Sequence, residues 1–239
     1  PVWESLKSRF YKKKYDPIFK LTRMKEEEII NITKKFVKEE LKDAEGGHDW
    51  WHIERVVNNT KLISQSEPVN KFAAELAALL HDIADAKFHD GNEDTGPEKA
   101  KDFLDPLSVK KDIVNHVENI IRNISFKGGN FSTNFYSREL AVVQDADRLD
   151  AIGAIGIARA FHYGGFKNRE IYNPSIAPDL QMDKETYKKS AGPTINHFYE
   201  KLLLIKDRMQ TETGKKLAEE RHHFMEIFLE HFYREWSGE

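Results

Sequence analysis

Apolar residues recur at helical spacing along most of the chain, and no run of four to eight residues alternates like a half-buried strand. In segment 25–41, "KEEEIINITKKFVKEEL", the apolar residues gather near one face and charged residues occupy the rest. Similar patterns predict further helices over 49–66, 70–85, from Pro97 onward, 108–123, 136–151, 151–161, 183–209 and 214–236. The chain is therefore predicted to be all-α.

Three polar stretches separate these segments and are expected to be loops: 86–100, 125–135 and 162–181. The second, "SFKGGNFSTNF", is long enough to have a function of its own. Glycines in segment 151–161 weaken the helix prediction there by about 1 kcal/mol each, although small residues let helices approach closely.

Segment 70–85, "NKFAAELAALLHDIAD", differs from the others because both of its faces are largely apolar. A helix of this kind is expected to lie in the centre of the protein. The apolar run ends in His81 and Asp82, followed by Asp85 and Lys87. Polar groups at the end of a central helix are candidates for a buried functional site.

Composition limits the partners of the chain without identifying one. The 239 residues, 39% of them hydrophobic, suffice for a sizeable core. Lys and Arg (37) nearly balance Asp and Glu (40), which leaves a net charge of -3. No global field therefore favours nucleic acid or an anionic membrane, and we expect neither as a partner.

The chain has no cysteine, which excludes disulfides and thiolate metal sites and is compatible with a reducing cytoplasm. It also lacks a spanning apolar stretch and a secretion signal, so we expect a soluble cytoplasmic protein. Residues 1–23 are basic and aromatic and precede Met24, and we leave open whether they are a native extension. Residues 24–239 are predicted to form a single helical domain, with a motif core over 45–163 and a helical C-terminal part over 164–239.

Histidines and aspartates with metal-binding potential occur in four separate segments. His48 and His52 lie four residues apart and share a helix face. The adjacent pair His81 and Asp82 can both reach an ion that lies beside their helix. The four segments together contain His48, His52, His81, Asp82, His116, Asp145, Asp147 and Asp150.

A buried aspartate costs several kcal/mol unless a cation or hydrogen bonds compensate its charge. A divalent metal ion would supply that compensation at Asp82 and at Asp147, which follows the apolar stretch "LAVVQDA". In any one segment, a hydrogen-bonded structural histidine or a capping aspartate is the more common explanation. The occurrence of three such segments in this order favours a metal site.

The motifs "HIERV", "AALLHDIAD" and "DADRLDAIG" resemble those of the HD-domain metal-dependent phosphohydrolases. The fuller set "GHDWWH", "HDIADAKF", "GPEKA", "ISFKGG" and "DADRLDAIGAIGIARAF" resembles a bacterial subgroup of small HD hydrolases that act on nucleotides. The resemblance covers about Met24 to Tyr163. It implies an all-α HD-domain bundle with a metal site in the core between helices.

Carried onto this sequence, the resemblance implies that His52, His81, Asp82 and Asp147 bind the metal. Two nitrogen and two oxygen ligands suit one divalent ion of Mn, Mg, Fe, Ni, Co or Zn, and we favour Mn. Four protein ligands on an octahedral ion leave two positions for water or substrate. His48 is interpreted as a cap or a support rather than as a ligand.

Other side chains are assigned to catalysis or substrate binding. Asp85 is expected to orient the attacking water, and it is assigned with Lys87 to the catalytic group. Phosphate contacts are expected from the cations Arg55, Arg122 and Lys127 and from His116, which is also a candidate ligand of a second metal.

The resemblance implies hydrolysis of nucleoside triphosphates to monophosphate and pyrophosphate by a metal-activated water. The alternatives are a nucleoside monophosphate phosphatase, another phosphoester hydrolase, and a non-catalytic sensor that binds metal or nucleotide. The expected partner is a small-molecule nucleotide. A homodimer is also considered.

Overall fold

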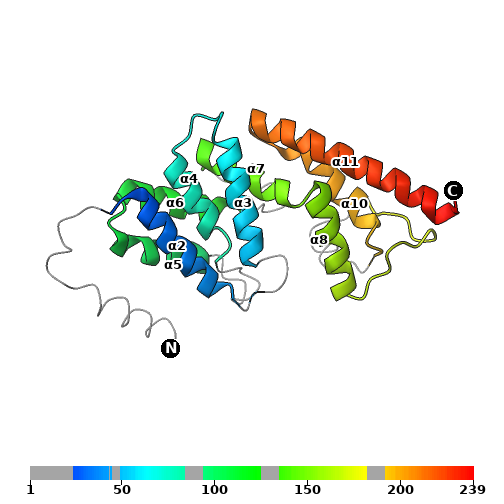
Figure 1. The fold of residues 1–239 in the computed structure, drawn as a ribbon, viewed down its shortest axis with the longest axis horizontal. Coiled ribbons are helices and arrows are strands. Elements are labelled where there is room, and N and C mark those ends of the chain that lie inside the picture. Colours follow the sequence, from blue (N-terminus) through cyan, green and yellow to red (C-terminus); the bar gives the residue numbers. More distant parts are fainter. Residues whose placement is uncertain (1–23, 43, 45–48, 84–93, 125–134, 182–191) are drawn as a thin grey trace.

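The computed structural model describes residues 24–42, 44, 49–83, 94–124, 135–181 and 192–239. Within these ranges the chain is helical and has no strand (Figure 1), which confirms the all-α prediction. The α-helices are α2 (Glu26–Glu40), α3 (Trp50–Ile63), α4 (Lys71–Leu80), α5 (Thr95–Leu104), α6 (Lys111–Ile124), α7 (Arg138–Asp150), α8 (Gly153–Phe166), α10 (Asn196–Glu200) and α11 (Glu212–Ser237).

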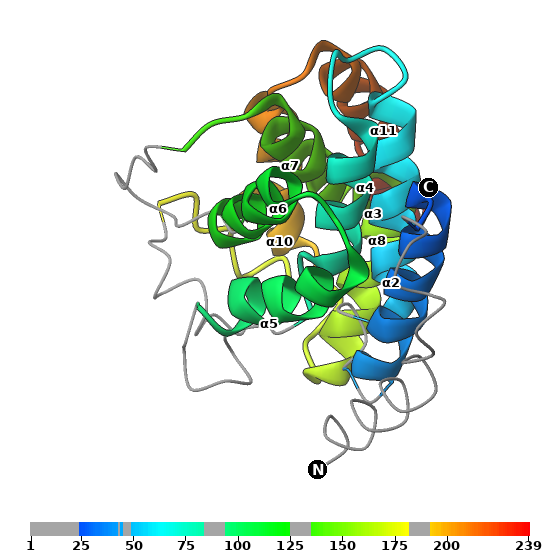
Figure 2. The same ribbon diagram turned by 90° about the vertical axis from the view of Figure 1, so that its left-hand side faces the viewer.

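The helices form two groups that share α7. Figure 1 shows α2, α4, α5 and α6 together on one side and α8, α10 and α11 on the other, with α3 and α7 between them. α7 packs against α3, α4 and α6 of the first group and against α8 and α11 of the second. Figure 2, turned by 90°, shows α5 and α6 in front of this central region. Side chains of α7 can therefore contact both groups.

Helix α4 lies at the centre of the first group, as its two apolar faces predict. It packs against α2, α3, α6 and α7, and most of its residues are buried. The side chain of Asn70 caps its start by accepting a hydrogen bond from the backbone N–H of Ala73, at 3.1 Å. The prediction of a helix to residue 85 is wrong at its end, because α4 stops at Leu80 and residues 81–83 form a turn.

Helix α3 begins at a capping aspartate. The carboxylate of Asp49 accepts a hydrogen bond from the backbone N–H of His52, at 2.9 Å. This bond satisfies one of the N–H groups that have no partner within the first turn of a helix. The cap therefore fixes the turn that carries His52, and the prediction of a helix start beside His48 and Asp49 is confirmed at Asp49.

Helix α8 is longer than the sequence pattern predicts. It continues to Phe166, so residues 162–166, predicted as loop, are helical. Gly164 is buried, and a Cβ there would lie 2.2 Å from the hydroxyl oxygen of Thr194. The glycine is needed for close packing and does not end the helix. The glycines at the end of α8 therefore led to the wrong prediction of a loop over residues 162–166.

The predicted long helix over 183–209 is wrong in its described part, residues 192–209. Gly192 and Pro193 lie outside any helix, and α10 ends after one turn at Glu200. Lys201 has φ -145° and ψ -56°, which interrupts the helical backbone before two 3-10 turns, Leu202–Leu204 and Lys206–Arg208. The apolar residues of this segment pack within the second group without forming one long helix, as Phe198 does against Phe161 of α8 and Phe228 of α11.

Helix α11 matches its predicted range closely. The hydroxyl of Thr211 caps its start by accepting from the N–H of Gly214, at 2.9 Å, and Gly238 ends it with φ 84°. Across the described residues, every helix is too short or too polar to cross a membrane.

Candidate metal centre

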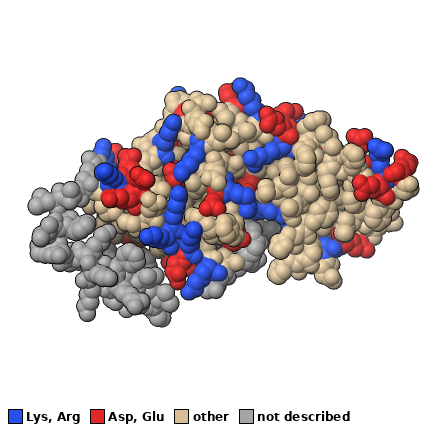
Figure 3. All heavy atoms as spheres, in the orientation of Figure 1, with Lys and Arg blue, Asp and Glu red and all other residues tan. Residues whose placement is uncertain are grey.

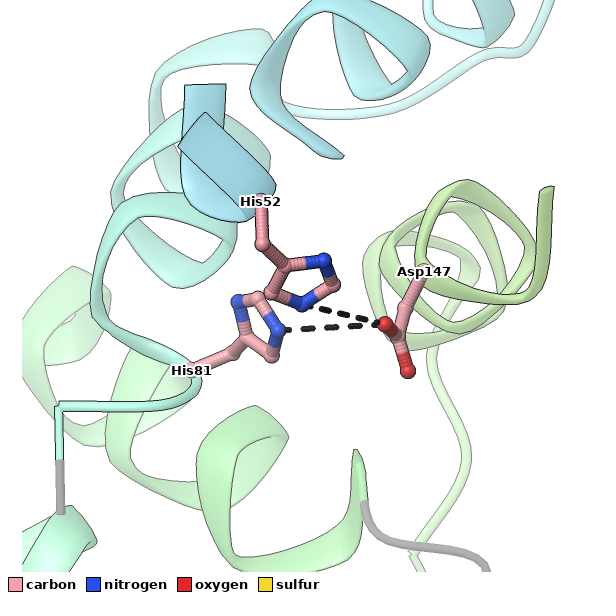
Figure 4. A group of neighbouring side chains, drawn as sticks. All are labelled: His52, His81 and Asp147. Atoms are coloured by element: carbon pink, nitrogen blue, oxygen red, sulfur yellow. Dashed lines mark ion pairs between the residues drawn. The ribbon is translucent and has the colours of Figure 1, made fainter. Parts of the chain in front are cut away.

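Three predicted metal ligands meet between α3, α7 and the turn after α4. The Nε2 atom of His52 lies 3.5 Å from Oδ1 of Asp147, and the Nε2 atom of His81 lies 4.0 Å from the same oxygen. All three ligand atoms lie within 4.8 Å of one another. Figure 4 shows both imidazole rings directed toward the Asp147 carboxylate, which comes from the opposite side.

The Nδ1 atoms of both histidines contact groups that only accept hydrogen bonds. The Nδ1 atom of His52 lies 2.8 Å from Oδ2 of Asp150, and that of His81 lies 2.9 Å from the backbone oxygen of Ala78. Because an ionised carboxylate and a carbonyl have no proton to donate, each Nδ1 carries the proton. When such a ring is neutral, its lone pair is on Nε2, the atom that faces Asp147.

This arrangement fits a divalent cation. Two imidazole lone pairs and a carboxylate oxygen point at one another, and these acceptors repel unless a cation or a proton lies between them. Ligands about 2.1 Å from one ion lie roughly 3.0 to 3.4 Å apart at angles between 90° and tetrahedral, and farther apart at wider angles. The observed separations of 3.5 and 4.0 Å are close to that geometry.

The centre is buried on its histidine side and open on its aspartate side. The side chains of His52 and His81 are 4% and 5% exposed, whereas that of Asp147 is 43% exposed. An ion held here could be reached by solvent or substrate past Asp147. Metal sites that keep such an open position are suited to catalysis rather than to a purely structural role.

Three aspartates of α7 have three different environments. Asp145 is fully buried and accepts hydrogen bonds from the backbone N–H groups of Gln210 and Thr211 before α11. Asp147 faces the two imidazole rings. Asp150 is buried on the far side of His52 and contacts its Nδ1. The structure therefore singles out Asp147 as the aspartate of α7 that lies with the histidines.

The Asp150 carboxylate is held by three positively charged or proton-donating side chains. It accepts from His52, from Nε and Nη2 of Arg55 at 2.6 and 3.0 Å, and from Nη1 of Arg159 at 2.6 Å. Burial raises the pKa of this carboxyl, but the hydrogen bonds of His52 and Arg55 and the charge of Arg159 outweigh it and hold the pKa well below its ordinary value. Asp150 is therefore a buried carboxylate whose charge is matched by its neighbours.

Comparison with known proteins identifies the family to which this helical fold belongs. Residues 50–152 match the family model of the HD domain. The YpgQ protein of Bacillus subtilis (strain 168) is 37% identical over 216 residues, which cover 90% of this chain and 97% of YpgQ. The chain belongs to the HD superfamily.

Two crystal structures show how far the likeness extends. An HD-superfamily hydrolase from Bacillus thuringiensis is 43% identical, with a TM-score of 0.74 over 90% of this chain and 100% of that one. Bacillus subtilis YpgQ in complex with ADP is 34% identical, with a TM-score of 0.68 over 89% of this chain and 97% of that one. The protein thus has the fold of an HD-superfamily hydrolase through most of its length.

The HD pair itself is only partly brought into the centre. His81 is in the group of three, whereas the ligand atoms of Asp82, which is partly exposed, are not part of it. The prediction placed both side chains on a continuous helix, but α4 ends before them. Asp82 therefore stays a predicted ligand.

Several predicted site residues lie outside the described part of the chain. These are the catalytic candidates Asp85 and Lys87, the phosphate candidate Lys127, and His48.

The other predicted phosphate-binding residues each contact a carboxylate. Arg55 pairs with Asp150. The Nε2 atom of His116 lies 3.1 Å from Glu139, and Arg122 contacts Glu118 and Asp94. Of these, Arg55 is the one linked to the HD centre, through Asp150 and His52.

Sequence reasoning missed Arg159, which reaches Asp150 from α8. The signal for it was present, because Arg159 is the sole Lys, Arg, Asp or Glu residue between positions 151 and 166.

On the face shown in Figure 3, basic and acidic side chains are intermixed over the first group of helices, and a broad uncharged area lies beside them. No continuous basic surface is visible on that face.

Proposed function

We propose that this HD-superfamily protein is a metal-dependent phosphohydrolase that converts nucleoside triphosphates to monophosphate and pyrophosphate. The observation that carries the proposal is the convergence of the Nε2 atoms of His52 and His81 with Oδ1 of Asp147. The nucleotide part is supported by YpgQ, a relative of nearly the same length whose crystal structure contains ADP.

His52, His81 and Asp147 would hold the ion, with Asp82 as the fourth ligand. Nitrogen and oxygen donors without sulfur favour Mn, Mg, Fe, Co, Ni or Zn, and we propose Mn. When bound, such an ion lowers the pKa of water and neutralises charge on phosphoryl oxygens. The protein supplies the rest of the chemistry by binding and orienting the reactants.

The burial of the two histidines determines the side from which a substrate enters. Because both rings are nearly inaccessible, phosphate groups would approach past the exposed carboxylate of Asp147. Asp85 is proposed to orient the attacking water and accept its proton, and Lys87 and Lys127 to neutralise phosphate charge.

Arg55, His116 and Arg122 are also proposed to contact substrate, but each is paired with a carboxylate in the structure. A phosphate would have to compete with Asp150 for Arg55 and with Glu139 for His116. The proposed metal ion, with Lys87 and Lys127, is therefore expected to contribute more to phosphate binding than these three residues.

The test is a nucleotide panel assayed with the full chain. Triphosphates, diphosphates and monophosphates are incubated with Mn²⁺, Mg²⁺, Co²⁺, Ni²⁺ or Zn²⁺, and phosphate and pyrophosphate are measured separately. We expect release of pyrophosphate from triphosphates with Mn²⁺, and its loss in Asp147→Ala. Asp207→Ala, at an exposed residue of a 3-10 turn, is the matched control.

Other products distinguish the alternatives. Release of inorganic phosphate from monophosphates indicates a nucleotidase and contradicts the proposed bond cleavage. Nucleotide binding without any product, under all five metals, indicates a sensor and contradicts catalysis. Asp85→Asn should bind Mn²⁺ like the wild type but turn over slowly, and full activity in this variant would remove Asp85 from the mechanism.

A further inference from the structure

Asp150 contacts the predicted metal ligand His52 at the ring nitrogen that points away from Asp147. Its Oδ2 atom lies 2.8 Å from Nδ1 of His52, while Nε2 of the same ring faces Asp147. A hydrogen bond at one ring nitrogen fixes the tautomer and the ring plane, and so determines where the other nitrogen points. The direction of the His52 lone pair thus depends on the position of Asp150.

The position of Asp150 depends in turn on two arginines from different helices. Oδ1 accepts from Nε of Arg55, and Oδ2 accepts from Nη2 of Arg55, Nη1 of Arg159 and Nδ1 of His52. Four donors therefore hold the carboxylate, three of them at Oδ2, the oxygen that contacts His52. Rotation of the buried carboxylate would break several of these bonds at once.

Arg159 also fixes the backbone around Asp150. Its Nη1 atom donates to the backbone oxygen of Asp150 at 3.1 Å as well as to the carboxylate at 2.6 Å. Arg159 lies on α8, beyond the matched HD-domain range of residues 50–152. The second group of helices thus contacts the support of a metal ligand directly.

We propose that Asp150 and Arg159 are positioning residues for the metal centre, so that metal affinity depends on α8 as well as on the elements that carry the ligands. Arg159 holds Asp150, and Asp150 holds His52 with its lone pair directed toward Asp147. The inference rests on the metal site of the proposed function but does not require the protein to hydrolyse nucleotides.

The first test measures Mn²⁺ affinity by titration calorimetry of the full chain. Loss of a hydrogen-bonding partner of a metal-ligating histidine typically weakens metal binding by about 10- to 100-fold. We expect an increase in Kd of roughly 10-fold for Arg159→Gln and closer to 100-fold for Asp150→Ala. Arg159→Lys, which keeps the charge and one donor to Asp150, should recover part of the affinity.

Arg221→Gln is the matched control for loosening of the same region. Arg221 comes from α11 and donates to the backbone oxygen of Leu149 and, at 3.0 Å, to Asn59, so it also ties down the end of α7. Its charge interacts with that of Asp150, but its hydrogen bonds go to Leu149 and Asn59 and to neither the Asp150 carboxylate nor a predicted ligand. We expect Arg221→Gln to lower the melting temperature while leaving the Kd for Mn²⁺ nearly unchanged.

The second test reads the tautomer of His52 in chelator-treated protein, by NMR of ¹⁵N-labelled histidine with His52→Gln as the assignment control. The wild type should carry the proton on Nδ1, and Asp150→Ala should shift the population toward Nε2. A merely structural role of Asp150 would leave the tautomer unchanged.

Two results would overturn the inference: wild-type Mn²⁺ affinity in Arg159→Gln, or a wild-type His52 protonated on Nε2. Neither would contradict hydrolysis of nucleotides. Conversely, weakened Mn²⁺ binding in Arg159→Gln together with a complete lack of turnover in the wild type would support the positioning role and contradict the proposed function.

Discussion

Asp145 and Thr211 join the middle of α7 to the start of α11. Oδ2 of Asp145 accepts from the Thr211 hydroxyl at 2.8 Å and from its backbone N–H at 2.7 Å. The same carboxylate accepts from the N–H of Gln210, at 3.0 Å, and is fully buried. One aspartate thus accepts hydrogen bonds from both backbone N–H groups of the two residues that precede α11, the longest of the described helices.

Asp145→Ala is expected to destabilise the fold by about 3 kcal/mol, because it leaves the buried N–H of Thr211 and the hydroxyl without an acceptor. Denaturant unfolding in the presence of a chelator measures the free energy of unfolding. Asp207→Ala, at an exposed position, should change it by less than about 0.5 kcal/mol. Equal effects of the two substitutions would show that the Asp145 contacts contribute little to stability.

Asp147→Ala should behave in the opposite way. It removes an acceptor that faces two imidazole lone pairs, so the chelator-treated variant should be at least as stable as the wild type. At a free Mn²⁺ concentration of about 100 times the Kd, binding should raise the free energy of unfolding of the wild type by about 2.7 kcal/mol. The variant should gain almost none. A matching Mn²⁺-dependent gain in the variant would remove Asp147 from the ligand set.

Adjacent glycines of α8 should respond differently to alanine. At Gly164 the new Cβ would lie 2.2 Å from the Thr194 hydroxyl, whereas at Gly165 it meets nothing within 4 Å. We expect Gly164→Ala to lose about 1–3 kcal/mol through overpacking, and Gly165→Ala to gain up to about 1 kcal/mol from helix propensity. Chemical denaturation of the pair decides between them, and a stabilised Gly164→Ala would contradict the packing described for α8.

Stability should fall in mild acid partly because of His197. Burial, with the charges of Lys201 and Arg169, lowers the pKa of His197 to about 3 from an ordinary value of 6.5. Below pH 6.5, His197 therefore binds a proton in the unfolded chain but stays neutral in the folded chain until the pH approaches 3. This contribution to stability is complete above pH 6.5 and is lost progressively as the pH falls toward 3.

The measurement compares unfolding free energies at pH 7.5 and pH 5 in the presence of a chelator. His197→Gln should reduce the difference between the two values, while His223→Gln, at a side chain that is 71% exposed, serves as the control. An undiminished pH dependence in His197→Gln would assign the acid sensitivity to other groups.

Helical periodicity was sufficient to predict α2, α3, α6, α7 and α11 because apolar residues recur at helical spacing along each of them. It failed where packing overrides composition. Gly164 looks like a helix breaker, yet Thr194 occupies the space beside it and α8 continues. The apolar residues of 192–209 look helical, yet Lys201 adopts a conformation that ends the helix.

The centre was predictable to a similar degree. Residue types and order indicated a metal site, and the resemblance to HD-domain hydrolases selected His52, His81 and Asp147, which the structure brings together. The pattern could not assign separate surroundings to Asp145 and Asp150, because both depend on partners distant in sequence, Thr211 and Arg159. Such pairings follow from the packing of α8 and α11 on α7, which has no local sequence signal.

The spacing of the three aspartates makes α7 intolerant of any change in length. Each residue turns an α-helix by about 100° and advances it by about 1.5 Å. Inserting or deleting one residue between Asp145 and Asp150 would rotate Asp150 away from His52 if the Thr211 anchor were kept, or break that anchor if His52 were kept. Engineered insertions in this protein should therefore be placed in its loops, because this segment of α7 functions as a ruler.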